Sequence, residues 1–136
     1  MLGIDKIIYA IQEVMQMCGI FGEIGNADRN DLAPFLHRMS YRGPDGEGWH
    51  EERNLIVGHV RLAIVDIQKG QQPVYSSRNT GVAYNGEIYN HNIFRQELER
   101  TSHRLSSDCD TEILPHLFEE YGPSSYAKLD GMFAFA

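Results

Sequence analysis

Met17-Cys18-Gly19-Ile20-Phe21-Gly22 is the stretch of this chain from which its fold and its chemistry are best inferred. Apolar residues alternate here with glycines, which allow close backbone packing, and the run predicts a strand that opens at Cys18. In a chain that begins at Cys18, one residue carries both a thiol and a free α-amine. Such groups ordinarily titrate close together, near pH 8.5 and pH 7.7–8.0. The amine can then take the thiol proton and return it to a leaving group, so Cys18 is a candidate nucleophile.

Residues 1–16 form a segment of their own, for which three interpretations remain open: a start site assigned too early, a removable leader, or a genuine helix that buries Cys18. Its apolar residues recur at helical spacing and predict a short amphipathic helix. Lys6, Gln12 and Glu13 interrupt the apolar character, and no small-residue cleavage site follows, which argues against a secretory signal. While these residues and Met17 remain attached, the nitrogen of Cys18 is an amide and the base is lost.

The composition is that of a single globular domain. The 136 residues are 42% hydrophobic and 23% charged, and the net charge of −7 with scattered basic residues argues against a nucleic-acid partner. No run of about 18 apolar residues is present, so we expect no membrane span. Two cysteines, Cys18 and Cys109, and six scattered histidines show no ligand spacing, so we expect no metal site. A reactive thiol must stay reduced, which favours the cytoplasm.

Short apolar runs predict the strands, which we expect over residues 18–25, 55–60, 62–67 and 82–84. Residues 41–48 contain three glycines and a proline and predict a structured loop. Asn85-Gly86 is a strong turn dipeptide. Residues 132–136 read as an apolar strand without a polar flank. We therefore expect the chain to end inside a domain, with one of its sheets incomplete or completed by a partner chain.

Three helices are expected from caps and apolar periodicity. The first begins near Asp28 or Asn30 and carries an inward stripe of Leu32, Phe35, Leu36 and Met39. The second runs from Asn90 or Asn92 through Arg100, with Ile93, Phe94 and Leu98 inward. The third follows Asp108 or Asp110, with a stripe of Ile113, Leu114, Leu117, Phe118 and Tyr121, and ends at Gly122-Pro123.

Each chemical motif is weak when taken alone. A cysteine in a glycine-rich strand is more often a core residue than a nucleophile, and Asn85-Gly86 is most often only a turn. Arg61, between two apolar runs, suits an edge position or an ion pair, and Asp108 most simply caps the helix that follows. Their order along the chain is more informative than any one of them.

Six motifs follow one another: Met17-Cys18-Gly19-Ile20-Phe21-Gly22, Tyr41-Arg42-Gly43-Pro44-Asp45-Gly46, Arg61-Leu62-Ala63-Ile64-Val65-Asp66, Asn85-Gly86-Glu87-Ile88-Tyr89-Asn90, Ser107-Asp108-Cys109-Asp110-Thr111-Glu112 and Leu129-Asp130-Gly131-Met132-Phe133-Ala134-Phe135-Ala136. This series resembles the class II glutamine amidotransferase domain, and most nearly the glutaminase half of glutamine-hydrolysing asparagine synthetases. The resemblance covers residues 17–136, which we interpret as a partial domain. It implies an α+β fold of the N-terminal-nucleophile hydrolase type, an αββα sandwich of two antiparallel sheets between helical layers.

The resemblance also implies a role for each matching residue. Cys18 would attack the side-chain amide of glutamine, while Asn85 and Gly86 would form the oxyanion hole. Arg61 would hold the substrate α-carboxylate through its planar guanidinium. Asp108, helped by Glu87, would hold the α-ammonium group. The loop at Arg42-Gly43-Pro44-Asp45 would contribute shape and support.

The function implied is hydrolysis of glutamine to glutamate and ammonia, with the ammonia used to make asparagine from aspartate. The partners would be glutamine and a synthetase domain or subunit, and homo-oligomers remain open. ATP and Mg²⁺ would belong to the synthetase part, and no cofactor is expected in this chain. Three alternatives stay open. One is a catalytically silent glutamine-binding or interaction module whose Cys18 stays masked. Another is the amidotransferase domain of a related amide- or lactam-forming synthetase. The third is a truncated fragment that folds poorly and has no activity alone.

Overall fold

The computed structural model describes residues 17–25, 28–63 and 70–136. Two sequence-based expectations, the helix within residues 1–16 and most of the strand over 62–67, lie outside these ranges. The described chain is a mixed α/β structure in which every pair of strands is antiparallel. No helix among the described residues has the length and apolar character needed to cross a bilayer.

The N-terminal half is a three-stranded sheet covered by one helix. The strands β1 (Gly19–Ile24), β2 (Gly46–Glu52) and β3 (Leu55–Arg61) pair in the order β1-β3-β2. Helix α2 (Arg29–Met39) is capped by Asp28, whose carboxylate accepts the amide N–H of Asn30 at 2.7 Å, as predicted from the sequence. Leu32 and Leu36 are buried, but Phe35 is 55% exposed, so the predicted stripe was too wide.

The C-terminal half builds its helices around a second pair of strands. Strand β6 (Tyr84–Ile88) pairs with β7 (Gly131–Phe135), and β4 (Val74–Tyr75) pairs with β5 (Gly81–Val82). The helical segments are α3 (His91–Glu99), η1 (Asp110–Glu112), α4 (Ile113–Tyr121) and η2 (Pro123–Lys128). A core of buried residues joins these elements: Val82, Tyr84, Ile88, Phe94, Leu98, Ile113, Leu114 and Leu117. Burying such side chains is the main driving force for folding this half.

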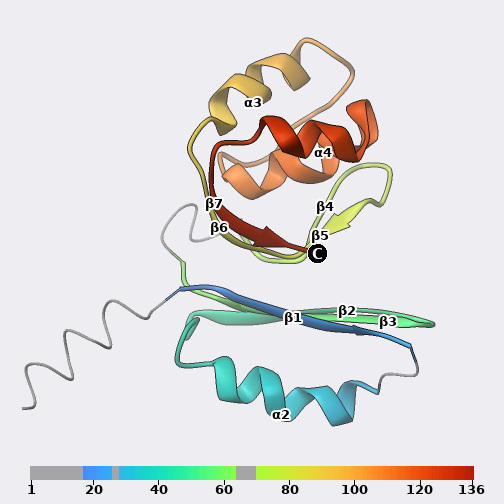
Figure 1. Ribbon diagram of the computed structural model, residues 1–136, viewed down its shortest axis with the longest axis vertical. Helices are drawn as coiled ribbons and strands as arrows, with labels where there is room; N and C mark the ends of the chain where they lie inside the picture. The colour runs from blue at the N-terminus through green and yellow to red at the C-terminus, as the bar shows by residue number, and fades with distance from the viewer. Residues whose placement is uncertain (1–16, 26–27, 64–69) are drawn as a thin grey trace, which may run out of the picture.

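The elements stack in layers, as Figure 1 shows. Helix α2 lies on one side of the β1-β3-β2 sheet, and strands β6 and β7 lie on the other side. Helices α4 and α3 lie beyond β6 and β7, away from the first sheet. The β6 strand therefore faces the first sheet on one side and the helices on the other.

Several sequence-based expectations for local structure were wrong. Strand β2 begins at Gly46, inside the stretch expected to be a loop. Asn85-Gly86 lies within strand β6 and does not form a turn. Gly86 has a φ of +143°, and a Cβ there would lie 2.1 Å from the carbonyl oxygen of Met132 on β7. Glycine is thus required at this position by close pairing inside a sheet.

Three further side chains expected in the core are exposed: Ile93, Phe118 and Tyr121. They lie at the margins of apolar stripes whose other members, such as Phe94 and Leu114, are buried. Periodicity locates an apolar face, but it does not say how much of that face the neighbouring elements cover. The strand expected over residues 132–136 was confirmed, since β7 pairs with β6 along its whole length.

His59 is expected to make the folded state sensitive to acid. It lies on β3, is 1% exposed and contacts the backbone of Tyr84, and burial lowers its pKa from 6.5 to about 4. In the unfolded chain the His59 imidazole is protonated as the pH falls through about 6.5, whereas in the folded chain it stays neutral until about pH 4. The stabilisation is full above pH 6.5 and is lost as the pH falls. Between pH 7 and pH 5 the loss amounts to about 2 kcal/mol at 1.36 kcal/mol per pKa unit.

Urea unfolding at both pH values measures this effect. A His59→Gln variant is expected to lose the part of the acid dependence that comes from His59. The matched control is His37→Gln on the exposed face of α2, which is expected to keep the full dependence. An unchanged pH dependence in His59→Gln would contradict the assignment.

Candidate functional site

A cavity of about 220 Å³ lies where β1 begins, β3 ends, and β6 meets η1. Five of the residues singled out from the sequence line it: Cys18, Arg61, Asn85, Gly86 and Glu87. They come from strands β3 and β6 and from the residue directly before β1, which only the fold brings together. The remaining lining residues are Met17, Leu62, Gly70, Gln72, Tyr84, Cys109, Asp110, Thr111 and Met132.

The sixth candidate, Asp108, does not line this cavity. Its side chain is exposed, whereas Asp110, two residues further on, is half-buried and belongs to the lining. Cys109 between them is buried, and η1 starts directly after it. The sequence analysis named only Asp108 for binding, whereas the structure places Asp110, the first residue of η1, at the cavity.

Asp110 is held by two hydrogen bonds from strand β6. The hydroxyl of Tyr84 donates to Oδ2 at 2.7 Å, and the backbone N–H of Ile88 donates to the same oxygen at 2.9 Å. Burial, together with the Asp110 carboxylate, raises the pKa of Tyr84 above its ordinary value, so the phenol stays protonated and remains a donor. Both bonds are made to Oδ2, so strand β6 fixes the position of the Asp110 carboxylate.

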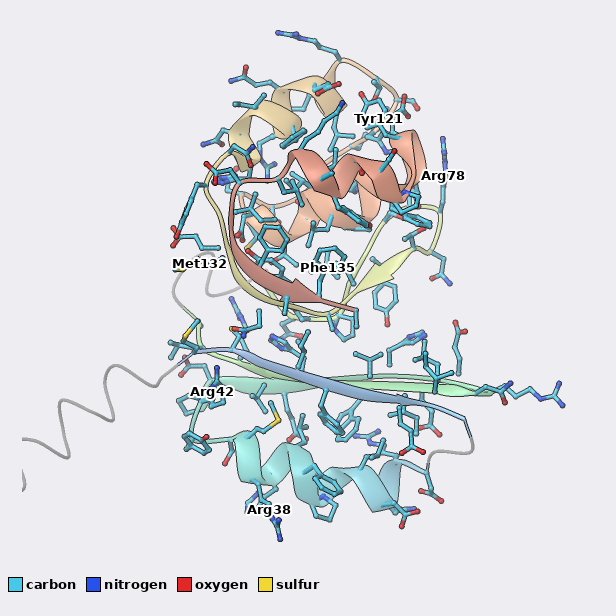
Figure 2. The ribbon with its side chains drawn as sticks, viewed as in Figure 1. Arg38, Arg42, Arg78, Tyr121, Met132 and Phe135 are labelled. Carbon is cyan, nitrogen blue, oxygen red and sulfur yellow. The ribbon has the colours of Figure 1, made fainter. Side chains whose placement is uncertain are left out.

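Cys18 is fixed by backbone and guanidinium contacts on both sides. Its Sγ accepts a hydrogen bond from the backbone N–H of Leu62 at 3.3 Å, just beyond the end of β3. Nε and Nη2 of Arg42 both donate to the carbonyl oxygen of Cys18 at 3.4 Å. Figure 2 shows Arg42 at the end of the sheet where β1 begins. Cys18 is therefore held at the cavity wall by two other motifs, its thiol by Leu62 and its carbonyl oxygen by Arg42.

The Arg-Gly-Pro-Asp loop also anchors the strand end that carries Arg61. The backbone N–H of Asp45 donates to the carbonyl oxygen of Arg61 at 3.0 Å, and Oδ2 of Asp45 accepts the N–H of Ala63 at 2.8 Å. A Cβ on Gly43 would lie 2.5 Å from the backbone nitrogen of Arg61, so a larger residue would push the loop away. The sequence analysis assigned shape and support to this loop, and these contacts show how the support is made.

Arg61 itself is only 9% exposed and reaches the cavity past a glycine. A Cβ on Gly70 would lie 2.5 Å from a terminal guanidinium nitrogen of Arg61 and 3.1 Å from Sγ of Cys109. The Arg61 guanidinium therefore fits in this position only because residue 70 is a glycine and has no side chain. Sequence reasoning missed Gly70, because nothing in the turn-rich segment around it points to one glycine in particular.

A serine clamp, formed by Ser106, Ser107 and Glu112, holds the loop that precedes Asp110. The backbone N–H and hydroxyl of Ser106 donate to Oε1 of Glu112 at 2.7 and 2.8 Å, and those of Ser107 donate to Oε2, both at 2.7 Å. Burial by itself raises the pKa of Glu112, but these four hydrogen bonds outweigh it and lower the pKa below its ordinary value. The buried carboxylate thus stays charged and keeps the turn into η1 in place.

The cavity brings opposite charges to one space. A thiol and a guanidinium lie on the side of the first sheet, and the carboxylates of Glu87 and Asp110 come from β6 and η1. Asn85 and Glu87 are two residues apart on β6 and so share one face of the strand. Such an arrangement suits a small ligand that carries both a negative and a positive group, placed beside a nucleophile.

Several known proteins are similar in sequence to this chain. A family model described as a glutamine amidotransferase domain matches residues 17–136. The chain is 42% identical over 125 residues to the glutamine-hydrolysing asparagine synthetases 2 and 3 of Arabidopsis thaliana and to asparagine synthetase 2 of Oryza sativa subsp. japonica. Each alignment covers 88% of this chain but 21% of the relative, so the chain spans about a fifth of the length of these proteins.

Proposed function

The chain belongs to the family of glutamine amidotransferase domains, and from this premise we propose that it hydrolyses glutamine to glutamate and ammonia. The observation that carries the proposal is the cavity, which joins a thiol at Cys18 to a guanidinium and to carboxylates. Glutamine has a reactive amide at one end and a zwitterion at the other, and these three kinds of group match it.

The zwitterionic end of glutamine would lie between Arg61 and Asp110. The guanidinium of Arg61 can donate two parallel hydrogen bonds to the α-carboxylate. Asp110, whose Oδ2 is engaged by Tyr84 and Ile88, would receive the α-ammonium, with the Glu87 carboxylate nearby. We therefore assign to Asp110 the role that the sequence analysis gave to Asp108. A free amino acid satisfies both sites, whereas a glutamine residue inside a peptide has neither charge.

Cys18 would act on the amide at the other end. Its sulfur attacks the side-chain carbonyl carbon, the C–N bond breaks, and ammonia leaves with the proton that the α-amine took from the thiol. Water then hydrolyses the γ-glutamyl thioester, which releases glutamate and restores the thiol. Asn85 and Gly86 would supply N–H donors to the oxyanion, and loss of one such donor costs about 10²–10³ in rate.

The ammonia would serve a second reaction. By similarity to the asparagine synthetases, we propose that it amidates aspartate in a synthetase domain or subunit, where ATP and Mg²⁺ would bind. The layers of helix and sheet described above support an N-terminal-nucleophile hydrolase sandwich. A nucleophilic thiol also supports a location in the reducing cytoplasm.

Substitution of the nucleophile tests the proposal. In a chain that begins at Cys18, Cys18→Ala is expected to abolish ammonia release from glutamine while glutamine binding, measured by calorimetry, is largely retained. The matched control is Cys109→Ala, because Cys109 is the other thiol at the same cavity and takes no part in the proposed chemistry. Hydrolysis that persists in Cys18→Ala would contradict the nucleophile assignment.

A further inference from the structure

A second cluster of reactive side chains lies on helix α4, among residues that the proposed chemistry does not use. His116 and Glu119 lie three residues apart on α4, and His103 comes from the segment that links α3 to η1. Nδ1 of His103 lies 2.9 Å from Nδ1 of His116 and 3.9 Å from Oε2 of Glu119. The potential ligand atoms of all three lie within 4.8 Å of one another.

The Glu119 carboxylate has one satisfied and one unsatisfied oxygen. Oε1 accepts a hydrogen bond from the hydroxyl of Ser76 in the turn between β4 and β5. Oε2 has no hydrogen-bond partner among the described residues. The Glu119 side chain is only 5% exposed, so this oxygen is buried. A buried carboxylate oxygen without a partner is costly, so this oxygen is poised to accept a ligand from the side of the histidines.

His103 is oriented by a second carboxylate behind it. Its Nε2 lies 3.0 Å from Oε2 of Glu120, while its Nδ1 faces His116 and Glu119. Histidines that bind metals almost always donate their other ring nitrogen to a carboxylate or carbonyl, which fixes the tautomer and leaves a lone pair for the metal. The Glu120 side chain is 30% exposed, so this second carboxylate lies at the protein surface.

We propose that His103 Nδ1, His116 Nδ1 and Glu119 Oε2 bind a divalent transition-metal ion, with Zn²⁺ as the best match. Two imidazoles and one carboxylate are an established zinc ligand set, and a water molecule would complete a tetrahedron. Zn–N bonds of about 2.0–2.1 Å at tetrahedral angles hold two nitrogens roughly 3.3 Å apart. In the structure the two nitrogens are joined by a hydrogen bond at 2.9 Å, within a few tenths of an ångström of that spacing, and the ion would replace the shared proton.

The sequence analysis expected no metal site because the six histidines are scattered without ligand spacing, and only the packing of His103 against α4 brings it to His116.

A bound ion would link three parts of the C-terminal half. It would tie the segment of His103 to α4, and through Glu119 and Ser76 to the turn between β4 and β5. Because η1 runs directly into α4, the ion would also stabilise the helix that follows Asp110. We expect the ion to have a structural role, in which it holds α4 and thereby the η1 residues that line the proposed glutamine cavity.

Competition with a chromophoric zinc chelator tests the site in the full chain. We expect one equivalent of Zn²⁺ to bind, and Glu119→Gln to weaken its affinity at least about tenfold. The matched control is Glu52→Gln, since Glu52 forms an exposed pair with His50 at 3.2 Å and is expected to leave the affinity unchanged. A Cys18→Ser variant is expected to keep the site, because the thiol takes no part in it.

A Co²⁺ spectrum keeps the test decisive if Glu119→Gln folds poorly. The unaltered chain with Co²⁺ is expected to show tetrahedral d–d bands without a thiolate-to-cobalt charge-transfer band. Circular dichroism checks the fold of each variant. Three results would overturn the proposal: no binding of Zn²⁺ at micromolar concentration, equal affinity in folded Glu119→Gln, or binding that Cys18→Ser removes.

Discussion

A chain that begins at Cys18 is expected to hydrolyse glutamine at least about 10²-fold faster than one that retains residues 1–17, the lower end of what a positioned base contributes. In the longer chain the nitrogen of Cys18 is an amide, which cannot accept the thiol proton. Met17 also lines the cavity beside Cys18, so its removal opens space as well as freeing the amine. Both effects act on the same residue and in the same direction.

The measurement compares ammonia release by the two chains at saturating glutamine. The intact mass of each protein establishes which residue is first. Cys18→Ala in the short chain is the control, and it is expected to be inactive. Equal rates in the two chains would show that another group acts as the base. If neither chain hydrolyses glutamine but both bind it, the silent binding module becomes the better interpretation.

Asp110→Asn is expected to weaken glutamine binding about 10²-fold, while Asp108→Asn is expected to leave it unchanged. The change at Asp110 removes the charge that would face the α-ammonium, and loss of one partner of a buried charge pair costs about 2–5 kcal/mol. At 1.4 kcal/mol per tenfold, the lower part of that range corresponds to about 10²-fold. Asp108 is exposed and does not line the cavity, so its charge is screened by solvent.

The pair of variants is well matched because both replace one carboxylate by an amide within the same short segment. The amide oxygen of Asn at position 110 can still accept the hydrogen bonds of Tyr84 and Ile88, so the loop should keep its position. Calorimetric titration in a Cys18→Ala background measures binding without hydrolysis. Weaker binding in Asp108→Asn with unchanged binding in Asp110→Asn would restore Asp108 as the ammonium ligand.

The sequence by itself indicated the family, a candidate nucleophile and most of the elements. The order of the motifs from Cys18 to the last strand indicated a glutamine amidotransferase domain, which the family match confirmed. Capping at Asp28 and the apolar runs of β1, β3 and β7 located their elements, because these signals act between residues close in the chain.

Only the tertiary structure decided which residues face one another. It placed Asp110 at the cavity in preference to Asp108, set Asn85-Gly86 inside a strand, and joined Arg42 to the carbonyl oxygen of Cys18. It also brought His103 against His116. Each of these outcomes depends on contacts between segments distant in sequence, and local spacing carries no information about such packing. Chemistry that resides in one residue can be inferred from the sequence, whereas chemistry shared across strands and helices requires the fold.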